Sequence, residues 1–600
     1  MKKQFYLSIM TLLSPFLLLA SCSKLANAED VDVAISNDIS FDNEASDTSA
    51  DANSGDVLSS DTFTGDETTK AFSIETSDGA YTNDGSTYTI TAYGSYTLKG
   101  KLEGQIVVDV AETEEGESTV ELVLKGVSIT YGSNSPIFIK SADEVKIKSN
   151  KDTYNIIKDT RANKVSDDDN QGEGAISAKC DLKFTGKGTL VVEANYNQGI
   201  HSSDDLKIKT STIKVTAYGH ALKGSDSFTL ESGNVLAISQ TADGVKTSNS
   251  TISSKGKQKG NITIYGGTLN VLSQTDGLDA AYDVNIYNGI DEDDGVTVTV
   301  PSVTIYTDKY ATSVLSSYAS GLAIPKRPGP GGPGGGGPGG GGFEPGNESN
   351  TDKSATTAKG IKSANDIVIK GGSIFLKCYD DGIHANYGEV IGEESEGRYS
   401  TGDVTMAGGN TTIYASDDGI HADRYLYLQG GVCDITYSYE GYEGNQINVT
   451  GGDFTAVAKD DGMNAGDANG QAPLTPDINV AGGVMKIWVS SNGDTDGIDS
   501  NGDYNQTGGV VFVGGPSNNN ASSLDVGDSG NKAYVTGGTL VAFGKPAASF
   551  SRGQNVNYST KSGTMSGTKN VTIGDESYEV VLPYSYSGAY IYSVSSVTIA

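Results

Sequence analysis

Two short segments of the chain carry almost the same polar sequence. They are YDDGIHANY at residues 379–387 and SDDGIHADR at residues 416–424. Each contains two carboxylates, a glycine, an apolar residue and a histidine in succession. This group can bind a metal ion, act as a catalytic site, or form only a turn in which Asp accepts backbone hydrogen bonds and Gly takes a positive φ. The repetition indicates that the element carrying the motif is itself repeated.

The spacing of the glycines indicates the size of that repeating element. From five Gly-Gly pairs, the glycine of an acidic-residue–Gly pair follows 11 residues later, as from Gly408 to Gly419. The return to the next Gly-Gly pair is again 11 residues from Gly360, Gly419 and Gly497. Two such steps predict a coil of about 22 residues, and longer returns, as from Gly382 to Gly408, predict loop insertions.

Positions 3, 5 and 7 after the first glycine of each pair are mostly apolar or small, which places them on one face of a strand. A coil this short must stack on its neighbours, at about 4.8 Å, to bury that face. The pattern predicts an all-β parallel β-helix. A propeller has repeats about twice as long, and β-sandwiches would not keep this spacing. The inward positions are Ile374, Leu376, Cys378, Thr411, Ile413, Ala415, Cys433, Ile435, Tyr437, Phe454, Ala456, Ala458, Met485, Ile487 and Val489.

Three cysteines lie in this part of the chain, an odd number that cannot pair completely. Cys378 and Cys433 point inward two coils apart, and the third is Cys180. Two coil steps separate Cα atoms by about 9–10 Å, which is too far for a disulfide. We expect buried free thiols.

Aligning the coils on the motif glycine generates two columns of polar residues. The apolar residue between them should point inward, so both columns are expected to face solvent along one edge. The residue before the glycine is Asp243, Asp276, Asp381, Asp418, Glu440, Asp461 or Asp496. The residue two after it is His201, Lys223, Lys246, Asp279, Lys362, His384, His421, Glu443, Asn464 or Asp499.

Carboxylates stacked at this spacing repel one another unless solvent, cations or metal offset the charge. Lys246 and Lys362 do so in the earlier coils, whereas residues 380–500 offer many oxygens and few cations. Ca²⁺ accepts irregular sets of oxygen ligands, so we expect it to bridge neighbouring coils, with turn chemistry as the alternative for any single Asp-Gly pair. The candidate ligands are Asp380, Asp381, Asp417, Asp418, Asp423, Asp460, Asp461, Asp467, Asp496 and Asp499.

His384 and His421 should stack on adjacent coils. Zinc could use both with a carboxylate, but the excess of oxygen ligands favours a stacking or hydrogen-bonding role toward a sugar. The candidate carbohydrate-binding residues are His384, His421, Arg424, Tyr425 and Asn464.

The net charge of −34 over 600 residues argues against nucleic acid as a partner. Lys2, Lys3 and the apolar stretch 5–20 form an export signal, and Leu-Ala-Ser-Cys at 19–22 resembles a lipobox, which implies lipidation of Cys22. An ordinary secretory signal with an incidental cysteine is the alternative. We expect a lipid-anchored monomer on the bacterial cell envelope, at the outer membrane or cell surface.

The expected organisation follows from composition. Residues 1–22 are the signal peptide and the acidic, Ser-rich residues 23–70 form a disordered tether. Residues 71–545 hold the repeats, interrupted by a Gly/Pro-rich loop at 325–355 that could also be an interdomain linker. Residues 546–600 leave the register and should form an antiparallel β cap.

Several stretches together resemble one known family. They include GSYTLKGKLEGQIVVDV, VELVLKGVSIT, SADEVKIKSNKDTYNIIKD and GAISAKCDLKFTGKGTLVVEANYNQGIHSSDDLKIKTSTIKVTA, and successive motifs match over about residues 75–545. The chain resembles the cellulose- and acidic-sugar-binding β-helix family, whose members are described as carbohydrate-binding domain-containing proteins. The resemblance implies a right-handed parallel β-helix similar to pectate lyases, Ca²⁺ in Asp-rich loops, and polysaccharide binding without established catalysis.

Three functions are therefore compared. The first is a surface-anchored, Ca²⁺-dependent, non-catalytic protein that binds acidic or plant-type polysaccharides. The second is a Ca²⁺-dependent polysaccharide lyase, which needs a base near the sugar C5 proton, with Arg424 and then Lys362 as candidates. The third is a protein-binding adhesin or structural spacer.

Overall fold

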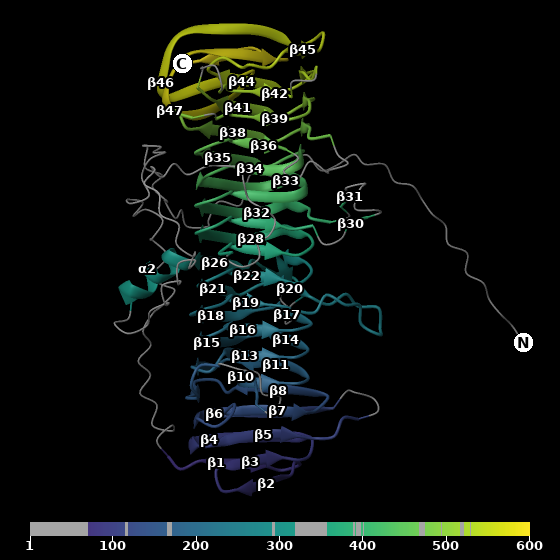
Figure 1. The fold of residues 1–600 in the computed structure, drawn as a ribbon, viewed down its shortest axis with the longest axis vertical. Coiled ribbons are helices and arrows are strands. Elements are labelled where there is room, and N and C mark those ends of the chain that lie inside the picture. Colours follow the sequence, from purple (N-terminus) through teal and green to yellow (C-terminus); the bar gives the residue numbers. More distant parts are fainter. Residues whose placement is uncertain are drawn as a thin grey trace, which may run out of the picture.

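The computed structural model describes residues 70–113, 118–164, 171–290, 295–318, 357–387, 390–391, 398–399, 401–466, 475–493, 495–516, 521–527 and 530–600. Strands dominate these residues and lie across the long axis of an elongated stack (Figure 1). The N-terminal coils form one end and the C-terminal strands the other. The expected signal peptide, Cys22, the Gly/Pro-rich loop and Asp467 lie outside the described residues.

The strands form three parallel ladders that run the length of the stack, and each coil contributes one strand to each. The first ladder carries the two polar columns. Its strands are β3 (Thr87–Ile90), β5 (Gln105–Asp109), β7 (Ile137–Ser141), β10 (Gly174–Ala178), β13 (Gln198–Ser202), β16 (Leu222–Gly224), β19 (Val245–Lys246), β22 (Leu278–Ala280), β27 (Ile361–Ser363), β29 (Ile383–Ala385), the starts of β33 (Ile420–Ser438) and β34 (Tyr442–Val449), β36 (Met463–Ala465), β39 (Asp499–Ser500) and β42 (Asp525–Val526).

The second ladder follows the first after a corner. It consists of the starts of β4 (Gly94–Glu103) and β6 (Thr119–Tyr131), β8 (Glu144–Ser149), β11 (Asp181–Gly186), β14 (Asp205–Ile208), β17 (Ser227–Leu230), β20 (Asn261–Ile264), β23 (Val284–Ile286), the starts of β28 (Ile367–Cys378) and β32 (Val404–Ala415), the middle of β33, the end of β34, β37 (Ile478–Val480), β40 (Tyr504–Gln506), β43 (Ala533–Val535) and β45 (Phe550–Arg552).

The third ladder completes each coil. It consists of the ends of β4 and β6, β9 (Tyr154–Asp159), β12 (Thr189–Ala194), β15 (Ser211–Ala217), β18 (Gly233–Ser239), β21 (Thr268–Ser273), β26 (Ser302–Thr307), the ends of β28, β32 and β33, β35 (Asp453–Ala458), β38 (Val484–Val489), β41 (Val510–Gly514) and β44 (Thr539–Phe543).

The register of the ladders confirms the predicted coil length. Leu222 is the partner of Ile200, and Ile383 is the partner of Ile361, each 22 residues later. The partner of Ile383 is Ile420, a longer step that contains the hairpin β30 (Val390–Ile391) and β31 (Arg398–Tyr399). This return is therefore a loop insertion, as the glycine spacing predicted. A similar hairpin, β24 (Gly289–Ile290) and β25 (Val298–Thr299), follows β23.

One apolar core runs through the interior of the stack, from Ile90 to Tyr592. It exists because alternate residues of each strand point inward, as in β12, where Leu190, Val192 and Ala194 are buried. Cys180, Cys378 and Cys433 are buried free thiols, as predicted. Burial raises the pKa of Cys433 to about 12, so this thiol remains protonated and unreactive at neutral pH.

One predicted inward position is wrong. Tyr437 is only partly buried, and Ser438 takes the inward position, because β33 contains an extra residue after Ile435 that shifts its register against β35. Such a bulge reverses which side chains face the core. The displaced ring of Tyr437 instead stacks on Tyr414 of the preceding coil, with centroids 4.9 Å apart.

The glycines of the Gly-Gly pairs and the glycines of the acidic motif are required for different physical reasons. Gly409, the second glycine of its pair, has φ +83°, a left-handed conformation that favours glycine. Gly419 of the acidic motif does not. A Cβ at Gly419 would lie 2.6 Å from Ile435 Cδ1 and 2.7 Å from the Gly441 carbonyl oxygen. The motif glycine is therefore required by the close approach of the next coil, and not by the turn conformation expected from Asp-Gly.

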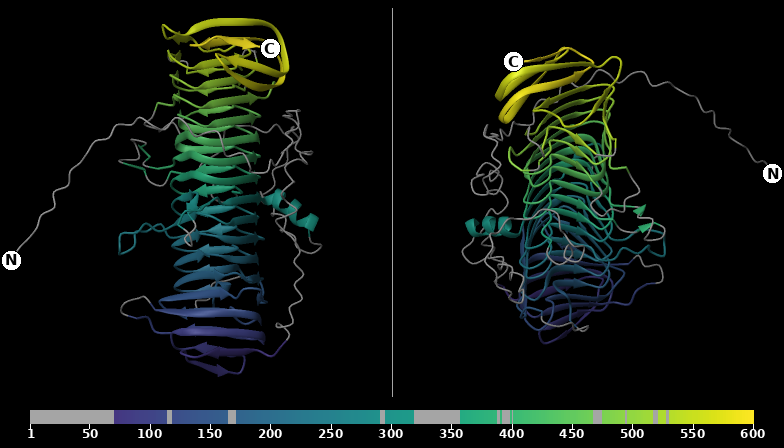
Figure 2. Two further views of the ribbon diagram at one scale, coloured as in Figure 1. Left: turned by 180° about the vertical axis from the view of Figure 1, so that it is seen from behind. Right: turned by 45° about the horizontal axis from the view of Figure 1, so that its top comes forward.

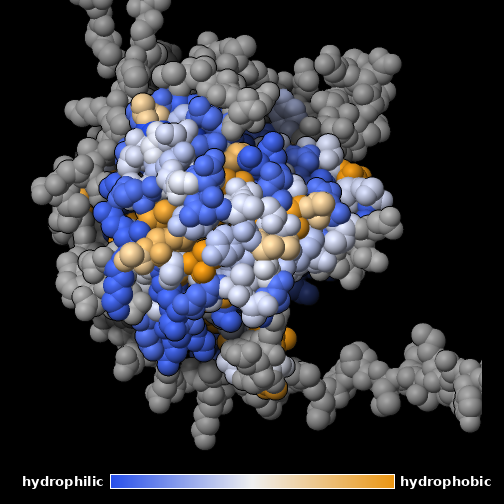
Figure 3. Space-filling model, turned by 90° about the horizontal axis from the view of Figure 1, so that it is seen from below, coloured by the Kyte–Doolittle hydropathy of each residue, from blue (hydrophilic) through white to orange (hydrophobic). Residues whose placement is uncertain are grey.

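Antiparallel strands close both ends. At the N-terminal end, β1 (Ser73–Thr76) pairs with β4 and β2 (Tyr81–Asp84) pairs with β3. This end presents a largely hydrophilic surface with small hydrophobic areas (Figure 3). At the other end, β46 (Asn557–Ile573), β47 (Glu576–Ser593) and β48 (Val597–Ile599) are antiparallel. Within the segment expected to be a cap, β45 still belongs to the parallel second ladder.

The C-terminal strands also cover the outer face of the third ladder. The pair β46–β47 extends beside the last coils (Figure 2) and buries Trp488, Phe512, Val541 and Phe543. Farther down the same ladder, helix α2 (Asp308–Tyr318) covers Leu236, Ile238 and Leu272. Among the described residues, no helix is long and apolar enough to span a bilayer.

Candidate functional site

The first ladder aligns the two polar columns as predicted. Residues two after the motif glycine are Cα partners in consecutive coils, from His201 through Lys223, Lys246, Asp279, Lys362, His384, His421, Glu443 and Asn464 to Asp499. We call this series the second column. The first column consists of the residues before the glycine, which the backbone hydrogen bonds of the glycines place one above another.

The carboxylates of the first column fasten each coil to the next. One oxygen of Asp381 accepts a hydrogen bond from the backbone N–H of Asp418, at 3.2 Å, and Asp418 accepts from Glu440 at 3.3 Å. Asp461 and Asp496 accept in the same way from the next coils, each at 2.7 Å. One oxygen of each carboxylate therefore holds two coils together, and the other oxygen is available to residues of the second column.

The central part of the columns is buried, contrary to the prediction that both columns face solvent. Asp381 and His384 are 2% and 1% exposed. The reason is the short coil spacing, because each side chain is covered by its equivalents in the coils on either side. Buried charges require partners, and the partners are the interacting members of the two columns.

The two histidines stack as predicted, with ring centroids 4.3 Å apart and planes inclined by 10°. Asp423 lies beside both rings, with its Oδ1 3.2 Å from Nε2 of His384 and 3.3 Å from Nε2 of His421. On the other side, His384 Nδ1 lies 2.6 Å from Asp381 and His421 Nδ1 lies 2.8 Å from Glu443. We call these residues and Asp418 the histidine cluster: Asp381, His384, Asp418, His421, Asp423 and Glu443.

The surroundings of His421 favour its charged form. Burial alone would lower its pKa, but Glu443, Asp418 and Asp423 raise it well above the usual value. Hydrogen bonds from both histidines lower the pKa of Asp423 below its usual range, despite burial. Burial and the neighbouring Glu443 raise the pKa of Asp418, so the Asp418–Glu443 pair holds a proton more readily than an isolated carboxylate.

Lysines neutralise the coils before the histidine cluster. Lys359 contacts Asp381 and lies 3.1 Å from Asp380, and Lys362 lies 3.2 Å from Asp276. Lys246 pairs with Asp279 and Asp243. The sequence pattern did not identify Lys359, which occupies the first column before Gly360, because the motif has an acidic residue at that position.

The coils after the histidine cluster lack such cations. In the described part of both columns beyond His421, the charged residues are all carboxylates: Glu440, Glu443, Asp461, Asp496, Asp499 and Asp525. Burial raises the pKa of Asp461 well above its usual value and that of Asp496 to about 7. A divalent cation bound to these carboxylates would offset their repulsion. Carboxylate oxygens are the ligands that Ca²⁺ prefers.

Several of the predicted ligands lie close enough together to share one ion. Ligand atoms within 4.8 Å of one another are offered by Asp380, Asp381 and Asp417, and by Asp418, His421 and Glu443. The first set is of oxygen only. Asp460 instead interacts with Tyr439, whose pKa is raised by burial and by that carboxylate. Two further sets are Asp381, His384 and His421, and Asp243, Asp276 and Asp279.

The two candidate lyase bases are both engaged, and in different places. Arg424 forms a two-point ion pair with Asp403, with Nε–Oδ1 2.6 Å and Nη2–Oδ2 2.7 Å. Lys362 is held by Asp276. The structure therefore does not bring these two bases to one carboxylate site. Asp403 belongs to no repeated motif, so the spacing of the glycines does not predict its contact with Arg424.

The remaining predicted sugar-binding residues are divided between two faces. Asn464 lies in the second column and donates to Glu440 at 2.9 Å. Tyr425 lies on the second ladder, stacked on Tyr427 at 5.4 Å. In the coils that follow, the register position of Tyr427 is occupied by Asn448, Asn479 and Asn505. The side-chain amides of these three residues hydrogen-bond from coil to coil at 3.1 Å.

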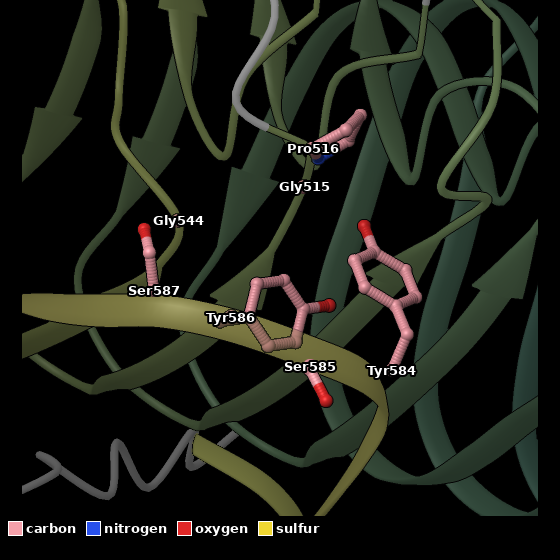
Figure 4. Close-up of a pocket in the computed structure, with 7 residues that line it drawn as sticks. All are labelled: Gly515, Pro516, Gly544, Tyr584, Ser585, Tyr586 and Ser587. Atoms are coloured by element: carbon pink, nitrogen blue, oxygen red, sulfur yellow. The ribbon is translucent and has the colours of Figure 1, made fainter. Parts of the chain in front are cut away.

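A small pocket lies apart from the columns, beneath the C-terminal strands. It has a volume of about 180 Å³, and the rings of Tyr584 and Tyr586, 4.5 Å apart, form one side of it (Figure 4). Its lining residues are Gly515, Pro516, Gly544, Tyr584, Ser585, Tyr586 and Ser587.

Comparison with known proteins identifies the family. A family model described as carbohydrate-binding domain-containing protein matches residues 84–393 and 388–494. The chain belongs to this family. A protein of the same description from Acetivibrio thermocellus is 40% identical over 130 residues, which cover 21% of this chain and 44% of that relative. The match thus spans less than half of the relative.

A solved structure is also similar over part of the chain. It is described as the polysaccharide lyase-like protein from C. thermocellum, gadolinium derivative, and is 32% identical. The match covers 39% of this chain and 86% of that one, with a TM-score of 0.34.

Proposed function

We propose that this protein is a lipid-anchored, Ca²⁺-dependent carbohydrate-binding protein of the bacterial cell envelope that recognises acidic or plant-type polysaccharides without cleaving them. Membership of the carbohydrate-binding domain-containing family supports the binding function. The lipobox-like sequence ending at Cys22 supports the anchor. We further propose that the three ladders form a right-handed parallel β-helix, which the parallel pairing of every third strand supports.

The observation that carries the calcium proposal is the uncompensated acidic end of the two columns. Asp461 and Asp496 lie in coils where, among the residues that the structure describes, neither column offers a cation. Bound Ca²⁺ would offset the repulsion between these coils and leave a positive charge for a uronate carboxylate. Without metal, a chain of net charge −34 would repel an acidic glycan.

Calorimetry of the metal-stripped full chain tests the proposal. Ca²⁺ should bind first, and polygalacturonate should bind only after it. Replacing Asp461 and Asp496 by Asn should weaken Ca²⁺ binding at least tenfold, whereas replacing the exposed Asp84 by Asn should not. Calcium binding that is equal in both variants would contradict this assignment of the site. An absence of binding to acidic and plant glycans, with or without Ca²⁺, would instead favour the protein-binding adhesin or spacer.

Whether the protein cleaves polysaccharide can be tested separately from binding. Because Arg424 and Lys362 are each held by a different carboxylate, we expect no unsaturated uronide on incubation with pectate and Ca²⁺. A rise in ultraviolet absorbance that is lost in Arg424→Ala would support the lyase alternative.

A further inference from the structure

Between helix α2 and the C-terminal strands, the outer face of the third ladder carries a column of tyrosines interrupted by one lysine (Figure 2). Lys377 lies between Tyr306 and Tyr414 in the register. Tyr437 follows Tyr414 in the next coil. Helix α2 covers Tyr306, and the C-terminal strands cover Trp488 farther along the ladder. Lys377 and Tyr437 are only partly buried, so the column reaches the surface between these two covers.

The start of α2 adds a second lysine and another tyrosine to this face. Lys309 Nζ lies 5.1 Å from the ring centroid of Tyr310 and 4.8 Å from that of Tyr379. Lys377 Nζ lies 5.3 Å from the centroid of Tyr310 and 5.2 Å from that of Tyr414. The rings of Tyr310 and Tyr414 meet edge to face at 5.6 Å. We call this group the tyrosine–lysine face: Lys309, Tyr310, Lys377, Tyr379, Tyr414 and Tyr437.

The tyrosine–lysine face is accessible at its outer edge and fixed at its base. Tyr379 is 43% exposed, and Lys309 is also exposed. The Tyr310 hydroxyl lies 3.1 Å from Ser416 Oγ, and the backbone N–H of Tyr379 donates to Thr307 Oγ1 at 3.1 Å. A ligand can therefore reach the ring of Tyr379 and the ammonium group of Lys309 without any movement of the coils.

Neither ammonium group of this face has a carboxylate within ion-pair distance in the part of the chain that the structure describes. Lys246, Lys359 and Lys362 of the polar columns all contact carboxylates. Asp380, directly after Tyr379, lies 3.1 Å from Lys359. Tyrosine rings attract an ammonium group but do not neutralise its charge. The face therefore offers two positive charges beside aromatic rings, in a chain of net charge −34.

We propose that the tyrosine–lysine face binds an acidic sugar unit. The uronate carboxylate accepts charge-assisted hydrogen bonds from Lys309 and Lys377, and the exposed ring of Tyr379 packs against the C–H groups of the sugar ring. A neutral sugar would leave both ammonium groups without an anion, and a small inorganic anion would leave the ring of Tyr379 without a contact. This inference rests on the proposed function, because it names the residues that hold the acidic glycan. Tyr379 directly precedes Asp380, so the sugar lies at the same corner of the coil as the oxygen-only set of candidate metal ligands.

Calorimetry with trigalacturonate, on the full chain at low ionic strength and saturating Ca²⁺, tests the inference. Lys309→Met and Tyr379→Ala should each weaken binding at least tenfold. The matched controls are Lys370→Met, which removes an exposed lysine 5.8 Å from the ring of Tyr287, and Tyr265→Ala, which removes a ring that is 40% exposed. Neither control should change the affinity. All four substitutions are at the surface, so urea denaturation should show the same stability in each. A loss in a control equal to that in its partner, or no loss in any variant, would overturn the site.

Two other ligands test the kind of ligand that the face accepts. Neutral cellotriose should show the same affinity for the wild type and for Lys309→Met. Polyglutamate, which has carboxylates but no sugar rings, should bind at least tenfold more weakly than polygalacturonate of similar length. Polyglutamate binding of equal strength, with an equal loss in Lys309→Met, would indicate a general anion surface and overturn the sugar assignment.

The same titrations in excess chelator separate this inference from the proposed function. Binding that requires Ca²⁺ and is unchanged in Lys309→Met and Tyr379→Ala would overturn the tyrosine–lysine face and leave the proposed function standing. Binding in chelator that both variants lose would leave the face standing and overturn the calcium dependence. If the wild type bound no acidic glycan under either condition, both proposals would be wrong.

Discussion

Four histidines lie along the first ladder, and their neighbours give them opposite properties. The carboxylates around His421 stabilise its imidazolium, whereas burial beside Lys246 and Lys223 lowers the pKa of His220 to about 4. The amino-acid types do not predict this difference. It follows from which residue the coil register places above and below each ring.

The pH dependence of the two histidines should therefore have opposite signs. An unfolded histidine titrates near pH 6.5. His421 has a raised folded pKa, so its stabilising contribution is complete below pH 6.5 and is lost as the pH rises through the folded value. His220 has a lowered one, so stability falls as the pH drops from about 6.5 to 4. Imidazole NMR shifts check both states at pH 7.

Two variants provide the stability readout in urea. His421→Gln should lose several kcal/mol at pH 7, because it leaves buried Glu443 and Asp418 without their cation. His220→Gln should remove part of the acid destabilisation between pH 6.5 and 4. If His421→Gln lowered the free energy of unfolding at pH 7 no more than His220→Gln does, the assignment of a protonated His421 would be wrong.

At the scale of the elements, sequence spacing predicts the fold well wherever the coil is regular. The columns, the inward positions and the stacking of His384 on His421 all follow from a constant repeat. The prediction is wrong where a single strand departs from the repeat. The extra residue in β33 turns Tyr437 outward, and no periodic pattern reveals a single-residue bulge.

The candidate site was predicted less completely for a related reason. Spacing identifies the column members, but burial depends on the distance between coils, which converts an expected solvent-facing edge into a buried ion network. The partner of Arg424 is Asp403, which lies before β32, outside both columns. Contacts of that kind cannot be obtained from a repeat alignment.

The requirement for glycine where two coils approach closely can be tested directly by substitution. Gly419→Ala should destabilise the protein by about 1–3 kcal/mol, since its Cβ would meet the Gly441 backbone at 2.7 Å and buried Ile435 at 2.6 Å. Gly466→Ala is the control, because a Cβ there would meet only side-chain atoms of Asn464 and Asn501, at 3.3 Å. Urea denaturation of both variants measures the difference. Equal stabilities would show that the coils can separate to admit a methyl group.

At the scale of the whole molecule, the C-terminal strands protect the face of the third ladder that would otherwise expose a row of large apolar side chains. Val580 is fully buried among them. Val580→Asp should therefore loosen these strands and expose Trp488, giving a red-shifted tryptophan emission and aggregation in size-exclusion chromatography. Glu579→Lys, at the neighbouring outward position, should elute as the wild type does. Unchanged emission in Val580→Asp would mean that the cap does not depend on this contact.

The direction of the ladders has a mechanical consequence. Backbone hydrogen bonds between coils run along the long axis, and the two ends of the described chain lie at opposite ends of the stack (Figure 1). A load that pulls these ends apart therefore opens the bonds one rung at a time and never shears a whole ladder together. Each released coil of 22 residues adds about 75 Å of chain. Under tension, such a rod would lengthen in small, reversible increments and act as an extensible tether between whatever holds its two ends.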